Sequence, residues 1–213
     1  MQNTDVNRLY ERVSPDNAAL LLIDFQTGLM LGIETSSFTT LRNNALALAT
    51  LGKVFSLPTI ITSSFSDGPN GHVMPEIISM YPDHEVINRT MVSAWDDEKF
   101  VAAVEKTGRK KLIMAAITTD VCLLFPAIAA IQAGYDVYAV IDASGTWGAQ
   151  AELATMMRLT QVGVKTTNWV SVAAELLRDW SKPIGQDLAE VFANHLTPYG
   201  YLIDNLKAAT AKH

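Results

Sequence analysis

Short apolar runs alternate with helical patterns along most of this 213-residue chain. The runs are dominated by Ala, Val, Ile and Leu, which is typical of strands that are buried on both faces of a sheet. The predicted strands are 18–23, 59–63, 86–87, 112–116, 137–141 and 164–166. Strands that are connected by helices pair in parallel, and the helices pack on both faces of the sheet. The sequence therefore predicts an α/β fold with a mostly parallel six-stranded sheet.

Helical patterns and turn residues fill the intervals between these runs. The predicted helices are 40–56, 96–107, 123–132, one that follows Thr146 and ends near 162, and 171–180. Loops are predicted around Gly28 and Gly32 and at 66–71, where Gly, Pro, Asn and Asp gather. We expect a single domain over 1–213, because the length suits one core and no linker-like stretch interrupts it. Its last part, from about 183, is predicted to be a helical tail.

The chain is acidic, with a formal net charge of -6 and a pI near 5.1. This balance argues against a nucleic-acid partner or an anionic membrane surface. No apolar run approaches the roughly 20 residues that a membrane span needs, and the N-terminus lacks the pattern of a signal peptide. A single cysteine cannot form an internal disulfide, which suits a reducing compartment. We expect a cytoplasmic protein.

The one cysteine, Cys122, lies where the predicted strand 112–116 gives way to the predicted helix 123–132. A thiol at a helix N-terminus feels the positive end of the helix dipole, which lowers its pKa. We therefore expect the pKa of Cys122 to lie below the ~8.5 of a free thiol. The alternative is that Cys122 only packs, since a cysteine in an apolar stretch is often a small core residue.

Asp24, Arg89 and Cys122 each lie at or just past the C-terminal end of a predicted strand. These ends converge on one crevice in an open parallel sheet. Taken singly, Asp24 could be a loop cap and Arg89 a surface cation. Together they supply a base, a cation and a thiol, because a carboxylate can take the thiol proton and a cation can hold both anions. The three residues are therefore candidates for a catalytic group.

Six short segments of the chain match a known family in order and together span most of its length. They are 21–26, 86–89, 93–95, 116–122, 135–137 and 142–145, and the most specific of the matches is Thr-Asp-Val-Cys at 119–122. By these segments the chain resembles the isochorismatase-like cysteine hydrolase superfamily, and within it the YcaC-like branch.

The resemblance implies a three-layer α/β/α sandwich of Rossmann-like type, with an Asp–Lys–Cys triad. Asp24 matches the aspartate and Cys122 the nucleophile, while Arg89 stands where most members carry lysine. It also implies a cis peptide bond at Ile117–Thr118 and an oxyanion hole made by the backbone N–H groups of Thr118 and Cys122. The implied activity is hydrolysis of an amide or related C–N or acyl bond of a small molecule through a thioester. The implied assembly is an octamer.

Three side chains near the strand ends are candidates for a substrate pocket. Phe25 and Trp147 could form its walls, although aromatic residues at such positions are more often part of the core. Gln26 could contact substrate, but its amide could also satisfy backbone groups of the loop. We expect no cofactor and no metal. The loop after the second strand offers only Asp67 and His72, which lack the clustered ligands of a zinc site.

Two other classes of function stay open at this point. A protein of this fold could bind a ligand without turning it over. It could also act as a redox thiol, although no second cysteine is available within the chain to resolve a sulfenic acid.

Overall fold

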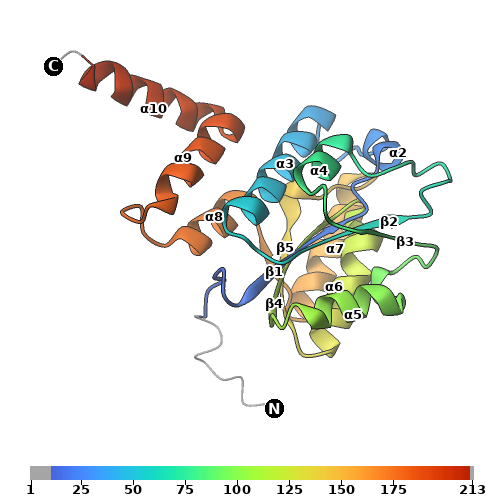
Figure 1. The fold of residues 1–213 in the computed structure, drawn as a ribbon. Helices are drawn as coiled ribbons and strands as arrows, with labels where there is room; N and C mark the ends of the chain where they lie inside the picture. The colour runs from blue at the N-terminus through green and yellow to red at the C-terminus, as the bar shows by residue number, and fades with distance from the viewer. Residues whose placement is uncertain (1–10, 212–213) are drawn as a thin grey trace.

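The computed structural model describes residues 11–211, and these form an α/β sandwich around one sheet (Figure 1). The sheet holds six strands in the order β3-β2-β1-β4-β5-β6, and every neighbouring pair is parallel. The strands are β1 (Ala18–Ile23), β2 (Thr59–Ser64), β3 (Val86–Arg89), β4 (Lys111–Ala116), β5 (Asp136–Val140) and β6 (Lys165–Thr167). The predicted six-stranded parallel sheet is confirmed.

Helices cover both faces of the sheet (Figure 1). The helices are α2 (Thr27–Leu31), α3 (Phe38–Val54), α4 (Pro75–Met80), α5 (Glu98–Lys106), α6 (Leu124–Gln132), α7 (Ala149–Gln161), α8 (Trp169–Leu177), α9 (Ile184–His195) and α10 (Thr197–Thr210). Strand β1 shows why two layers form. Its residues are fully buried, and they alternate between a core shared with α3, α8 and α9 and a second core shared with α5 and α6.

The strand order places a reversal between β1 and β4. The chain moves from β1 outward to β2 and β3, and it then returns to β4 on the other side of β1. In open α/β sheets, loops that leave the strands at such a reversal diverge to opposite faces, and ligands bind between them at the carboxyl ends of the strands. Ile23, the last residue of β1, is in register with Ala116, the last residue of β4. The loops carrying Asp24 and Cys122 therefore start side by side.

Three local features differ from the sequence expectations. The loop predicted around Gly28 and Gly32 contains the short helix α2, and a second short helix, α4, begins at Pro75. The helix predicted from Leu123 is preceded by a π-helical turn, Thr119–Leu123, that contains Cys122. Short helices of five or six residues carry too little periodicity to separate them from loop composition.

The last two helices extend from the body of the molecule (Figure 1). Helix α9 packs on the core through Leu188, Val191 and Phe192. Helix α10 has no buried residue, and it carries the exposed side chains of Tyr201 and Leu202. Within residues 11–211, no helix is both long enough and apolar enough to cross a membrane.

Candidate active site

Asp24 follows the buried strand β1, and its carboxylate is fully buried. Its backbone has a φ of 58°, a left-handed conformation that is uncommon for a residue with a side chain. Its N–H donates to the carbonyl of Thr62 on β2 (3.2 Å), and the Thr62 hydroxyl donates to its Oδ1 (2.7 Å). Strand β2 therefore fixes both the backbone and the side chain. Strained conformations of this kind gather at functional sites.

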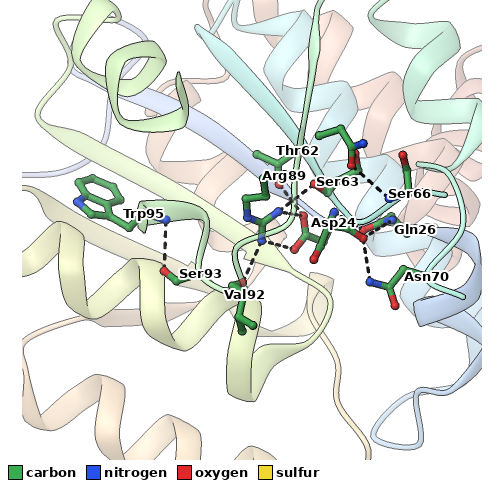
Figure 2. A network of polar contacts seen from close by, with 12 residues as sticks. Asp24, Gln26, Thr62, Ser63, Ser66, Asn70, Arg89, Val92, Ser93 and Trp95 are labelled. Atoms are coloured by element: carbon green, nitrogen blue, oxygen red, sulfur yellow. Dashed lines mark hydrogen bonds and ion pairs between the residues drawn. The ribbon is translucent and has the colours of Figure 1, made fainter. Parts of the chain in front are cut away.

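Arg89 ends β3, which is two strands away from β1. Neighbouring strands are about 4.8 Å apart, so the two backbones are separated by about 10 Å. The guanidinium crosses above β2 to meet the carboxylate, with Nη1 at 2.7 Å from Oδ1 and Nη2 at 2.6 Å from Oδ2 of Asp24 (Figure 2). Nη1 also donates to the carbonyl of Ser63 (3.1 Å) and Nη2 to that of Val92 (3.2 Å). The paired fork geometry fixes the carboxylate in one orientation.

Neither side chain of this ion pair is exposed to solvent. Burial alone would lower the pKa of Arg89. The hydrogen bonds and negative charge of Asp24, with smaller contributions from Cys122 and Asp97, outweigh it and raise that pKa above its ordinary value. Arg89 is therefore a permanent cation and cannot exchange protons.

Cys122 lies in the π-helical turn between β4 and α6, and 8% of it is exposed. The carboxylate of Asp24 and the backbone N–H of Thr118 are the polar groups that act most strongly on its thiol. Burial, together with the charge and hydrogen bond of Asp24, raises the pKa of Cys122 to about 12. The Thr118 N–H and the charge of Arg89 oppose this rise without reversing it.

The expectation of a thiol with a lowered pKa was wrong. It rested on a helix dipole, and that effect is modest beside the cost of ionising a buried group next to a carboxylate. A thiol with a pKa of about 12 is protonated at neutral pH, and the nearby Asp24 carboxylate favours that protonated form. This arrangement suits a nucleophile that loses its proton to a base only as it attacks.

The peptide bond between Ile117 and Thr118 is cis, as the resemblance implied. Backbone hydrogen bonds hold the loop around it to two neighbouring segments. Ile117 donates to the carbonyl of Ile23 on β1 (3.2 Å), and Thr119 donates to the carbonyl of Gly145 beyond β5 (2.9 Å). These contacts place the Thr118 N–H toward the sulfur of Cys122.

The same loop is tied to the one that follows β5. The hydroxyl of Thr146 donates to Oδ1 of Asp120 at 2.6 Å. Asp120 is thereby occupied with positioning the loop, and it lies two residues from the thiol. The carboxylate near Cys122 that contacts the thiol is that of Asp24.

The three pocket candidates lie in different environments. Phe25 is 1% exposed and packs in the core that includes α3, so its ring is not available to a ligand. Gln26 is fully buried; its Nε2 donates to the carbonyls of Ser64 and Gly71, and its Oε1 accepts from the Ser64 N–H. Phe25 thus packs in the core and Gln26 satisfies backbone groups, the alternative roles that the sequence offered for them. Trp147 is 47% exposed and remains a candidate.

Sequence reasoning missed the contribution of β2. Thr62 bonds the carboxylate of Asp24, and the Ser63 carbonyl accepts from Arg89, so this strand supports both charged partners. A signal was present, because all three residues at the carboxyl end of this strand, 62–64, carry hydroxyl groups and follow the apolar pair Ile60 and Ile61.

The loop after β2 brings no group of metal ligands together. Among residues 11–211, no cluster of three or more His, Cys, Asp or Glu side chains could hold a metal ion. His72 is exposed in that loop, and Gln26 and Asn70 donate there to backbone carbonyls.

The sequence model of the isochorismatase domain matches residues 18–171, a range that includes Asp24, Arg89 and Cys122. The chain belongs to the isochorismatase family. It is a YcaC-like member of that superfamily, as its motifs predicted. "Probable hydrolase YcaC" of Escherichia coli (strain K12) is 43% identical over 202 residues, which are 94% of this chain and 97% of that protein.

Solved structures agree with this placement. YcaC from Pseudomonas aeruginosa, with hexane-2,5-diol and covalent acrylamide, has a TM-score of 0.91 at 42% identity and covers 93% of this chain and 98% of its own. YcaC from Escherichia coli, described as an octameric hydrolase of unknown specificity, has a TM-score of 0.92 at 42% identity, with 94% and 98% covered. An isochorismatase family protein from Burkholderia thailandensis, at 18% identity and a TM-score of 0.67, shares the fold and covers 78% of this chain and 97% of its own.

Proposed function

We propose that this protein is a cysteine hydrolase that cleaves a C–N amide bond of a small molecule through a thioester intermediate. One observation carries the proposal: Arg89 holds the Asp24 carboxylate with two parallel hydrogen bonds, and that carboxylate is close enough to the Cys122 thiol to raise its pKa. A nucleophile, a base within reach of its proton and a group that orients the base form a complete unit for acyl transfer.

In the acylation step, the Cys122 proton moves to Asp24 as the sulfur attacks the carbonyl carbon. The C=O electrons move onto the oxygen, and the backbone N–H groups of Thr118 and Cys122 are suited to stabilise that oxyanion. The C–N bond then breaks, and Asp24 returns the proton to the departing nitrogen. The products of this step are a free amine or ammonia and a thioester on Cys122.

In the deacylation step, water replaces the amine. Asp24 takes a proton from water as the hydroxide oxygen attacks the thioester carbonyl, and the C–S bond breaks as the proton passes to the sulfur. The acid leaves and the thiol is restored. Arg89 gives and takes no proton in either step, because it stays charged. It keeps Asp24 oriented and balances the negative charge that forms on the sulfur.

The relatives support a hydrolase with a reactive nucleophile. The Escherichia coli relative carries the name of a probable hydrolase, and the Pseudomonas aeruginosa structure holds acrylamide covalently. Acrylamide is an electrophile, and this chain has a single cysteine with which such a reagent can react.

Intact-mass analysis tests the proposal directly. The protein is incubated with a panel of small primary amides and quenched in acid, and acyl adducts are located by peptide mapping. The expected result is a substrate-sized acyl adduct on Cys122 that hydroxylamine removes, with release of ammonia. Cys122→Ser is the matched control, since it keeps the size and removes the thiol. Ammonia release that is unchanged in Cys122→Ser would refute the mechanism, and oxygen-sized additions alone would favour a redox thiol.

We propose in addition that the protein acts as a homo-oligomer, and by similarity to the Escherichia coli relative as an octamer. The exposed apolar side chains of α10 support this. Tyr201, Leu202 and Leu206 are 63–69% exposed on a helix with no buried residue, and such patches are uncommon on soluble monomers.

Light scattering at micromolar concentration measures the assembly. We expect an octamer for the wild type and smaller species for a Leu202→Asp, Leu206→Asp double variant. The control is Asp204→Asn, which changes an exposed polar residue of the same helix. A monomeric wild type would contradict the proposal.

A further inference from the structure

The loops at the carboxyl edge of the sheet are acidic. They comprise residues 24–37, 64–74, 89–97, 117–123 and 141–148. Arg89 is their one arginine, His72 is their one histidine, and they contain no lysine. Against these stand seven carboxylates: Asp24, Glu34, Asp67, Asp96, Asp97, Asp120 and Asp142. The charged residues of the loops around Cys122 are therefore predominantly negative.

The single arginine of this edge is already occupied. The four terminal N–H groups of Arg89 are directed to the two oxygens of Asp24 and to the carbonyls of Ser63 and Val92. Its side chain is fully buried in the ion pair. Arg89 therefore neutralises Asp24 and has no terminal donor left for a carboxylate or phosphate of a ligand.

Exposed apolar side chains surround the same edge. Phe65, Val92, Phe125 and Trp147 are 39–61% exposed, and they come from four different loops or helix starts. Their backbones adjoin the site: Phe65 donates to the carbonyl of Arg89 (2.7 Å), and the carbonyl of Val92 accepts from the Arg89 guanidinium. Phe125 is three residues beyond Cys122, and Trp147 follows the Thr146 that bonds Asp120.

We propose that the site selects uncharged substrates with an apolar side group and rejects anionic ones. This inference rests on the proposed hydrolase function. An anionic group that approaches Cys122 would lose water without gaining a cation, and it would lie in the field of several carboxylates. An apolar group would instead cover the rim side chains Phe65, Val92, Phe125 and Trp147. The substrate class is then a neutral aliphatic or aromatic amide.

Alkylation of Cys122 tests the electrostatic part without any turnover. Iodoacetamide and iodoacetate have nearly the same size and the same leaving group, and they differ in charge. Their second-order rate constants are measured on the protein and on 2-mercaptoethanol, a neutral reference thiol. We expect the ratio of iodoacetamide to iodoacetate to exceed that of the reference by at least about tenfold at low salt, and to shrink as salt is added. An equal or smaller ratio would overturn the inference, as would a thiol that reacts with neither reagent.

A matched substrate pair tests the selection during hydrolysis. 5-Methylhexanamide and 4-carbamoylbutanoate share the amide and the chain and differ in a terminal isopropyl or carboxylate group. We expect kcat/KM to be at least about 100-fold higher for the neutral amide, because burying an unpaired charge weakens binding by several factors of ten. Preference for 4-carbamoylbutanoate would overturn the inference while leaving the hydrolase function intact. Absence of turnover with both, together with the expected alkylation ratio, would refute the function and leave the charge selection standing.

A charge introduced at the rim sharpens the result. Val92→Lys places a cation on an exposed position beside the Asp24–Arg89 pair, and Val92→Gln is the uncharged control of comparable polarity. We expect Val92→Lys to raise the iodoacetate rate constant about three- to tenfold relative to Val92→Gln, with the iodoacetamide rate constant changed by less than about twofold. Equal effects of the two substitutions on both reagents would count against charge selection.

Discussion

The sheet carries an ion network at each of its two edges, fully buried at the carboxyl edge and partly exposed at the amino edge, and the two are built differently. At the carboxyl edge, Arg89 and Asp24 form a two-fold hydrogen-bonded pair with contacts of 2.6 and 2.7 Å. At the amino edge, Asp136 lies 3.2 Å from the ammonium groups of both Lys111 and Lys165. One network has a single rigid partner for its carboxylate, whereas the other shares its carboxylate between two flexible cations.

The positions of these residues explain the difference. Lys111, Asp136 and Lys165 are the first residues of β4, β5 and β6, so their contacts join the starts of three neighbouring strands. Both lysines also lie over the ring of Tyr138, at 5.7 and 5.0 Å from its centroid. The amino-edge network can therefore set strand register. The carboxyl-edge network holds a single carboxylate near a thiol, which suits the chemistry that we propose.

Replacing a cation by methionine should have very different effects at the two edges. In Arg89→Met, the buried carboxylate of Asp24 loses its counter-ion, and a carboxylate in that state favours its neutral form, which is no base. We expect kcat/KM to fall by at least about 100-fold and the free energy of unfolding to fall by about 3–5 kcal/mol. Amide hydrolysis and urea unfolding measure the two quantities. A folded Arg89→Met protein with near wild-type activity would exclude Asp24 and Arg89 from the mechanism.

Lys111→Met is the counterpart at the amino edge. Lys165 still contacts Asp136 in this variant, and the methionine can pack on the ring of Tyr138. We expect the free energy of unfolding to fall by about 1–2 kcal/mol, with kcat/KM within about twofold of the wild type. A loss of activity as large as that of Arg89→Met would mean that the two edges are coupled, and the division of roles would be wrong.

Arg89→Lys separates charge from geometry at the carboxyl edge. Lysine keeps the charge but has one nitrogen, so it cannot bind both oxygens of Asp24 in parallel while reaching Val92. We expect kcat/KM to fall by about tenfold, clearly less than in Arg89→Met. Steady-state kinetics of the two variants side by side decide this. Equal losses would show that the fork geometry is as necessary as the charge.

The fold was predictable because each central strand is an apolar run with a clear end. Strand β1 was predicted with its observed limits, since buried parallel strands need no alternation to be recognised. Helices α2 and α4 were not predicted, because five or six residues cannot show a helical period. The π-helical turn before α6 was also beyond prediction, as it depends on the contacts of Thr118 and Thr119 with neighbouring loops.

The candidate site was predictable as a set of residues but not as an electrostatic environment. Asp24, Arg89 and Cys122 all follow strand ends, and parallel pairing brings those ends together. The direction of the Cys122 pKa was wrong because the sequence does not reveal how completely the thiol is buried or how strongly the Asp24 carboxylate acts on it. Burial of Phe25 and Gln26 was likewise a matter of tertiary packing.

The raised pKa of Cys122 predicts that the stability of the protein changes with pH through a group at the carboxyl edge. A group whose pKa is higher in the folded protein stabilises it below the pKa of the unfolded chain, and this stabilisation is lost as the pH rises toward the folded value. For Cys122 the window runs from about 8.5, the value of a free thiol, to about 12. Within it, the free energy of unfolding should fall by about 1.4 kcal/mol per pH unit because of this one thiol.

Cys122→Ala removes the group and should flatten the pH dependence between 8.5 and 9.5. This interval lies below the pKa values of the buried tyrosines in the folded protein. Burial raises the pKa of Tyr138, at the amino edge, above its ordinary value of 10, and it raises the pKa of Tyr81 to about 12. Ionisation of these tyrosines in the unfolded chain is centred near their ordinary pKa of 10, and it contributes equally to the slopes of the wild type and Cys122→Ala, so it cancels in the comparison. The measurement is urea unfolding at several pH values, and slopes are compared so that the cavity left by the substitution cancels. Equal slopes for Cys122→Ala and the wild type would show that the thiol ionises as readily in the folded protein as in the unfolded chain, and the picture of a protonated nucleophile held by Asp24 would fail.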